Sequence, residues 1–146
     1  GIENISNDAE GSWKQSTPDG NFLQFDGQGN ATLNVPKDLL IQVGGNLTIN
    51  VGENQTVTVA MNAMESVGMN KTVGVGMMKM LSVGANFMTN VTGKLTHYVK
   101  GDLETFGEKE HKLTALKGVQ VNSEKKIEHH SKKEVQNNSG EKSKNY

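Results

Sequence analysis

A valine recurs every eight residues along the middle of the chain, and this period is the strongest pattern in the sequence. The uninterrupted series is Val35, Val43, Val51, Val59, Val67, Val75, Val83, Val91 and Val99. Glycine follows five of these valines, and asparagine often stands three residues after them, so the unit reads V-G-x-N-x-T-x-x. Nine matches in one frame are not a chance arrangement. The chain is therefore predicted to consist of octads, the eight-residue units that begin at these positions.

The period continues after the valines end, although the composition changes. Lysines recur in the same frame at Lys109, Lys117, Lys125 and Lys133, and serines occupy the valine position at Ser123, Ser131 and Ser139. Residues 35–146 are 112 in number, which is fourteen octads without an insertion. We predict a linker and cap over residues 1–34, a Val/Gly-rich octad region over 35–107, and a Lys-rich continuation with a tip over 108–146.

Apolar and polar residues alternate within the octads, and this alternation predicts β-strands with one wet face. Because eight is even, odd-numbered residues share one face through every octad. That face carries residues such as Leu47, Ile49 and Val51, whereas the even-numbered face carries Asn, Thr, Ser and Gly. Each octad is predicted to contain about five strand residues and a corner at which Gly and Asn tolerate positive φ.

The first 34 residues do not follow the period. Asp19-Gly20 and Asp26-Gly27 are turn signals on either side of residues 21–25, and a further strand is predicted over 31–35. Residues 1–15 are predicted to be a loosely ordered entry strand and 20–35 a hairpin-like cap. Trp13 is predicted to pack at that junction.

The apolar content is too small for a core within one chain. Leu, Ile, Val and Phe number 33 of 146 residues. Burying a valine side chain contributes about 1.5–3 kcal/mol, whereas ordering one residue costs about 1.5 kcal/mol. Two or three inward apolar groups per octad cannot offset that cost alone, and an eight-residue turn is too short to wrap three faces in one chain. We therefore predict an intertwined homotrimer in which three chains share each layer.

Composition excludes several other classes of protein. The chain has no Cys, so it has neither a disulfide framework nor a thiolate site. All 15 basic residues are Lys and the net charge is −1, which gives no footprint for nucleic acid. No apolar run is long enough for a membrane helix, and residues 1–10 show no signal peptide. No catalytic, cofactor-binding or metal-binding set stands out from the repeat, and we predict that the chain is not an enzyme.

The octads VGGNLTIN, VGENQTVT, VGMNKTVG and VGANFMTN resemble the C-terminal β-helix of VgrG spike proteins of type VI secretion systems and the related needle of contractile phage tails. This resemblance covers residues 35–107 strongly and 108–146 by frame. It implies an all-β fold, an intertwined homotrimeric triangular β-helix, or prism, in which each octad places a strand on one face. Strands that stack at about 4.7 Å would give fourteen layers a length of roughly 65 Å.

The resemblance implies a structural, membrane-puncturing needle of a contractile injection spike. Its partners would be a PAAR-repeat tip protein or effector, the secretion tube or baseplate through upstream domains, and transiently a target membrane. It would be assembled in the bacterial cytoplasm and exported through the injection apparatus without a signal peptide. The tip, and hence the partner-binding residues, would be Lys142, Ser143, Lys144, Asn145 and Tyr146.

Some alternatives remain open. A trimeric phage-fibre or adhesin shaft that binds a surface glycan would share the trimer, although seven scattered aromatic residues per chain disfavour it. A single-chain solenoid enzyme of the hexapeptide type is disfavoured because its six-residue period is absent. Three copies of an inward histidine could hold a metal ion, although core packing is favoured; His97, His111 and His129 have the inward parity. The seven methionines between Met61 and Met88 are interpreted as flexible gap-filling side chains.

Overall fold

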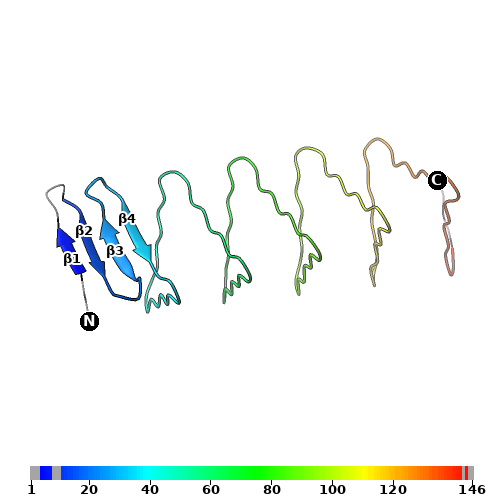
Figure 1. The fold of residues 1–146 in the computed structure, drawn as a ribbon. Coiled ribbons are helices and arrows are strands. Elements are labelled where there is room, and N and C mark those ends of the chain that lie inside the picture. The colour runs from blue at the N-terminus through cyan, green and yellow to red at the C-terminus, as the bar shows by residue number, and fades with distance from the viewer. Residues whose placement is uncertain (1–3, 8–10, 143, 145–146) are drawn as a thin grey trace. The chain divides into compact units, whose positions relative to one another are not determined.

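The computed structural model describes residues 4–7, 11–142 and 144, and its regular structure is all-β, with no helix among these residues. Four strands form one antiparallel sheet in chain order: β1 (Asn4–Asn7), β2 (Trp13–Ser16), β3 (Phe22–Phe25) and β4 (Ala31–Asn34). The sheet is labelled in Figure 1. Sequence analysis anticipated the β3 and β4 stretches but treated residues 1–15 as one loosely ordered strand. Two paired strands lie there instead.

The chain consists of two compact units, residues 1–74 and 75–146. The first unit contains the sheet and then continues as extended backbone with bends at 36–37, 44–45, 52–53, 60–61 and 68–69. The second unit has the same local form, with bends that begin at 76–77 and recur every eight residues to 140–141. The bends thus always fall on the second and third residues of an octad. They continue in this frame where the sequence becomes Lys-rich.

The hairpin turns of the sheet require glycine, but the octad corners do not. Positive φ is found at Gly20 (95°) and Gly29 (94°) in the β2–β3 and β3–β4 turns. Among the described residues, no glycine of the octad region has a positive φ. The prediction that Gly and Asn supply positive φ at the corners is therefore wrong. A hairpin must reverse the chain direction, whereas an octad corner only bends it, which ordinary negative φ values allow.

Serine has a local role where it replaces valine in the Lys-rich octads. The Oγ atoms of Ser123, Ser131 and Ser139 accept hydrogen bonds from the backbone N–H two residues later, at 3.2, 3.3 and 3.4 Å. These N–H groups belong to the bends, in which hydroxyl side chains commonly replace a backbone acceptor. Serine at this position therefore supports the corner directly.

Asp26 organises the β3–β4 turn. Its carboxylate accepts hydrogen bonds from the side-chain amide of Asn30 (2.7 Å) and from the backbone N–H groups of Gln28 (2.7 Å) and Asn30 (3.1 Å). These bonds, with that of the Asn30 side chain the strongest, lower the pKa of Asp26 from its ordinary value of 3.8. The charged form is therefore favoured in the folded sheet.

We expect Asp26→Asn to destabilise the sheet at neutral pH and the difference from wild type to vanish in acid. Because the pKa is lower in the folded state, the stabilisation is fully present above about pH 5 and is lost as the pH falls below 3.8. The fluorescence of Trp13, the only tryptophan, reports the transition because its ring lies 5.5 Å from that of Phe25. Asp38→Asn, outside both turns, is the matched control. A difference in stability between Asp26→Asn and the wild type that does not change with pH would contradict this account.

Candidate trimerisation surface

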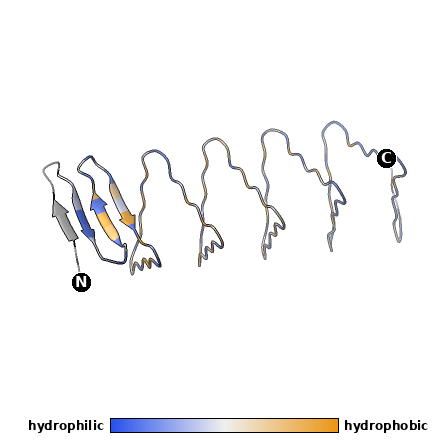
Figure 2. Ribbon diagram, viewed as in Figure 1, coloured by the Kyte–Doolittle hydropathy of each residue, from blue (hydrophilic) through white to orange (hydrophobic). Residues whose placement is uncertain are grey.

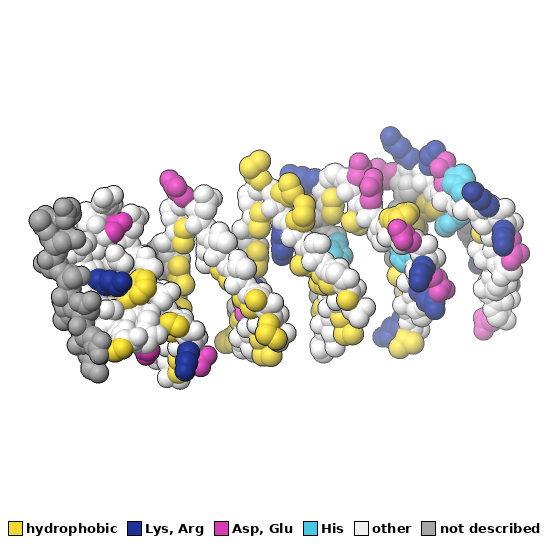
Figure 3. Space-filling view, in the orientation of Figure 1, with side chains coloured by type: hydrophobic (Ala, Val, Ile, Leu, Met, Phe, Trp, Pro, Cys, Tyr) yellow, Lys and Arg dark blue, Asp and Glu magenta, His cyan; other side chains and the backbone are white. Residues whose placement is uncertain are grey.

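The apolar residues of the octad region have no partners within the chain. Among residues 11–142 and 144, neither a hydrophobic nor a polar residue is buried. Hydrophobic side chains are visible on the surface in Figure 3. Between two bends, odd-numbered residues share one face of the extended backbone, as with Leu47, Ile49 and Val51, which are all exposed. A continuous apolar face of this extent is typical of an interface rather than of a monomer's surface.

The backbone of the octad region is also unpaired within one chain. The backbone–backbone hydrogen bonds of the described residues belong to the four-stranded sheet and to its turns, such as Thr17 N to Asn21 O at 3.0 Å. The extended segments after residue 35 therefore have N–H and C=O groups that need acceptors and donors. Pairing with strands of other chains satisfies these groups and covers the apolar face at the same time.

One ion pair lies on this apolar face in the first unit. The Lys71 ammonium donates a hydrogen bond to the Glu65 carboxylate, and the side chains are 52% and 61% exposed in the single chain. Both residues are odd-numbered, so they share the parity of Val67 and Val73. In the predicted trimer such a pair would accommodate two charges at inward positions, because each would neutralise the other when the face is covered.

Breaking this pair is expected to destabilise the trimer more than removing both charges. Losing one partner of a buried pair costs about 3–5 kcal/mol because a lone charge remains, whereas an apolar replacement of both is often neutral. Lys71→Leu should therefore lower the melting temperature, measured by circular dichroism, more than Glu65→Leu/Lys71→Leu. A lower melting temperature for the double variant would contradict burial of the pair.

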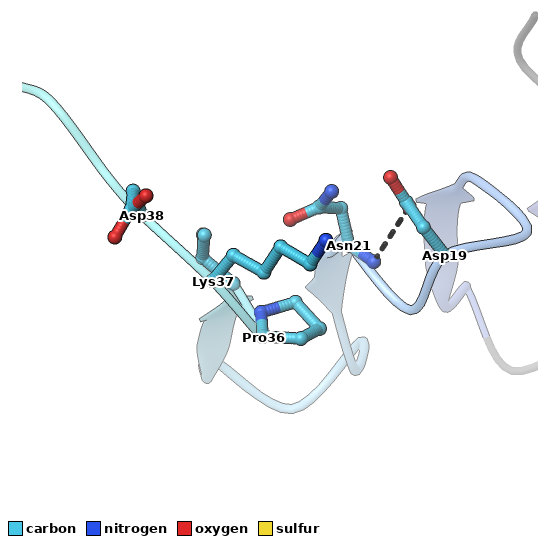
Figure 4. A pocket seen from close by; sticks show the side chains of 6 residues that line it. Asp19, Asn21, Pro36, Lys37 and Asp38 are labelled. Atoms are coloured by element: carbon cyan, nitrogen blue, oxygen red, sulfur yellow. Dashed lines mark hydrogen bonds between the residues drawn. The ribbon is translucent and has the colours of Figure 1, made fainter.

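The joint between the sheet and the first octad contains a small hollow of about 140 Å³, lined by Asp19, Asn21, Val35, Pro36, Lys37 and Asp38. Figure 4 shows the Asp19 carboxylate accepting the Asn21 N–H, at 3.3 Å. The Thr17 hydroxyl and this N–H, in that order, lower the pKa of Asp19. The Asn34 side-chain amide donates to the Gly20 carbonyl at 2.9 Å. These bonds fasten the turn rather than form a catalytic set.

The Lys-rich octads carry exposed ion pairs. Glu128 Oε1 lies 2.6 Å from the Lys126 ammonium, and Glu128 Oε2 lies 3.4 Å from Nε2 of His130. The hydrogen bond with Lys126, which is the larger cause, and the hydrogen bond with His130 lower the pKa of Glu128. Lys112 and Glu110 form a longer pair at 3.6 Å. Such solvated pairs contribute little to stability, and they are typical of a solvent-exposed surface.

The predicted tip is only partly described. Lys142 and Lys144 are exposed, and the Lys142 carbonyl accepts a hydrogen bond from the Ser139 hydroxyl at 2.9 Å. Ser143, Asn145 and Tyr146 lie outside the described residues. The assignment of these five residues to a partner-binding tip therefore stays a prediction.

The histidines and methionines also remain apart from any site in one chain. His97, His111 and His129 are exposed, and the described residues contain no cluster of three or more His, Asp or Glu side chains placed to hold a metal ion. The seven methionines are among the most exposed apolar residues, up to 100% at Met77. The part of the chain that the structure describes contains no helix long and apolar enough to span a bilayer.

Most of the octad region and part of the sheet match a known protein family. Residues 18–113 match the model of the bacteriophage T4 gp5 C-terminal trimerisation domain. The chain belongs to this family. The gp5 C-terminal trimerisation domain is the needle, or β-helix, part of the gp5/VgrG spike, so the VgrG-type resemblance stated from the octads is consistent with the match. Comparisons with the curated proteins and with the solved structures gave no match.

Membership explains why one chain alone has no core. The gp5 C-terminal family is a structural trimerisation domain of a spike, which supports a homotrimer. Sequence analysis predicted the homotrimer from the octads, but it missed β2 and its pairing with β3. No alternation of apolar and polar residues signals this strand, because residues 13–16 (WKQS) contain a single apolar residue.

Proposed function

We propose that this chain forms the membrane-puncturing needle of a contractile injection spike of the VgrG type. The observation that carries the proposal is the eight-residue recurrence of bends in an extended, unpaired backbone with no buried residue. Membership in the gp5 C-terminal family supports the trimer that this backbone requires. No observation favours the alternative of a glycan-binding fibre.

Three chains would form a triangular β-helix in which each octad contributes one strand to one face. Successive layers on a face would then come from different chains, so every strand would be hydrogen-bonded to its neighbours in other chains. A strand of such a needle is difficult to detach, because its hydrogen bonds to the strands on both sides must be broken. Stiffness is the property that a shaft pushed through a membrane needs.

The C-terminal end would carry the partner. An end formed by Lys142–Tyr146 in three copies would leave open strand edges, which proteins normally cover. A PAAR-repeat protein or an effector would cover them. In this proposal the spike is assembled in the bacterial cytoplasm, joins the tube or baseplate through upstream domains, and is exported by the injection apparatus.

Removal of the last octad separates tip binding from trimer formation. A trimer without residues 139–146 should fail to co-purify with a PAAR-repeat protein, whereas a trimer without 51–58 should retain binding because its tip is unchanged. Both deletions shorten the chain by one octad, so each is the matched control of the other. Equal binding by the two variants, or no binding by the wild type, would contradict the proposed tip.

A further inference from the structure

The four-stranded sheet has one apolar face that the octad region does not cover. Cross-strand partners share a face, and the pairs Trp13–Phe25 and Leu23–Leu33 therefore place odd-numbered residues together. We call this the Trp13 face. Its described residues are Trp13, Gln15, Leu23, Phe25, Ala31 and Leu33. Figure 2 shows the apolar residues of β3 and β4 in orange.

The opposite face carries one large apolar side chain, which a cation covers. It consists of Lys14, Ser16, Phe22, Gln24, Thr32 and Asn34. The Lys14 ammonium lies 4.3 Å from the centre of the Phe22 ring, so the one large apolar group on this face is covered by a cation. The Trp13 face has no such cover: Phe25 is 46% exposed and Leu33 is 57% exposed.

The Trp13 face is continuous with the interface of the octad region. A shallow hollow of about 230 Å³ connects this face to Val35, the first valine of the octads. It is lined by Gln15, Leu23 and Leu33 of the Trp13 face, by Ser16 and Phe22 of the opposite face, by Thr17 and Asn21 of the β2–β3 turn, and by Val35. The family match begins at residue 18, so β3 and β4 belong to the trimerisation domain itself. The occupant that this continuity indicates is a second copy of the chain.

The sheet supplies information that the octads lack. A chain displaced by eight residues still places valine against valine, for example Val51 in the place of Val43. Repeating segments of this kind specify their register weakly. The sheet occurs once per chain, so the apolar faces of the sheets can pack together only when the chains are aligned.

We infer that the Trp13 faces of the three copies pack against one another and set the register of the octads in the trimer. If one chain were displaced by one octad, Leu23, Phe25 and Leu33 would no longer be buried at that contact. The packing of the faces requires only the trimer. The register role also rests on the three-faced β-helix of the proposed function.

Thiol protection tests the contact in the assembled protein. The chain has no Cys, so Leu33→Cys and Thr32→Cys each introduce one reporter, on neighbouring residues of opposite faces. In the trimer the thiol at 33 should react with an aromatic disulfide reagent at least about tenfold more slowly than the thiol at 32, because it reacts only after local opening. Equal rates would overturn the contact and leave the face to another partner, such as an upstream domain.

Disulfide formation tests the register. In the three-faced arrangement, the three copies of a Thr96→Cys thiol lie on different faces when the chains are aligned. A chain displaced by one octad brings its residue 96 beside that of a neighbour, about 4.8 Å away, which is within disulfide reach. Oxidised trimers should contain linked dimers when Leu33→Asn is also present and lack them with the control Thr32→Asn.

Two outcomes would overturn the register role. One is a Leu33→Asn trimer without linked dimers, and the other is linked dimers at the same level in the control. If Leu33→Asn does not assemble, Leu33→Ala takes its place under the same criteria. Failure of PAAR binding would leave both results standing, so this inference and the proposed tip are tested separately.

Discussion

Val67→Asp is expected to abolish the trimer. Val67 is odd-numbered and faces the apolar side of its octad, at 47% exposure in the single chain. In the trimer the substitution would introduce three carboxylates at one level of the shared core. An uncompensated buried charge costs several kcal/mol per ion, and three like charges add repulsion, which together exceed the stability of most small proteins.

Ser66→Asp is the matched control for this prediction. It adds the same charge one residue earlier, on the even-numbered face that remains wet. The mass in solution and the thermal melting curve should match those of the wild type for Ser66→Asp, whereas Val67→Asp should give monomers or aggregates without a cooperative transition. A stable Val67→Asp trimer would show that this face is not the core.

Deleting four residues is expected to be far more damaging than deleting eight. Removal of residues 51–58 takes out one complete octad, so every later bend keeps its frame and the trimer should lose only a few degrees of melting temperature, as in other repeat proteins. Removal of residues 51–54 takes out half an octad, so every later bend is displaced by half an octad relative to the frame of the preceding octads. The bends would then lie at positions where strands must pair.

The two deletions should be compared by mass and by circular dichroism at the same protein concentration. The eight-residue deletion should give a folded trimer. The four-residue deletion should give no trimer with the wild-type melting behaviour. Similar behaviour of the two deletions would contradict a structure organised by octads.

Much of the chain's organisation was predictable because the octad pattern is global. Nine valines in one frame define the bends and the two faces without reference to any single contact, and the structure bends at 44–45, 52–53 and onwards in that frame. The sheet was harder to predict because four-residue strands carry little periodic signal. Residues 13–16 (WKQS) contain one apolar residue, and their strand identity depends on pairing with β3.

The error at the corners has a physical origin as well. Glycine after valine, as at Gly44 and Gly52, resembles the glycine of tight turns, and only the geometry shows that φ is not positive there. Likewise, parity placed Glu65 and Lys71 on the same apolar face, but it could not show that they pair across the intervening bend. Contacts between octads depend on side-chain reach, which the repeat does not encode.

The mass of the chain in solution tests the central claim, the core shared by three chains, most directly. Light scattering over a wide range of protein concentration should give three times the chain mass of 15.8 kDa, independent of concentration, together with the circular dichroism of β-structure. A well-folded monomer of 15.8 kDa would contradict the account, because the apolar face and the backbone of the octads would then have to be satisfied within one chain.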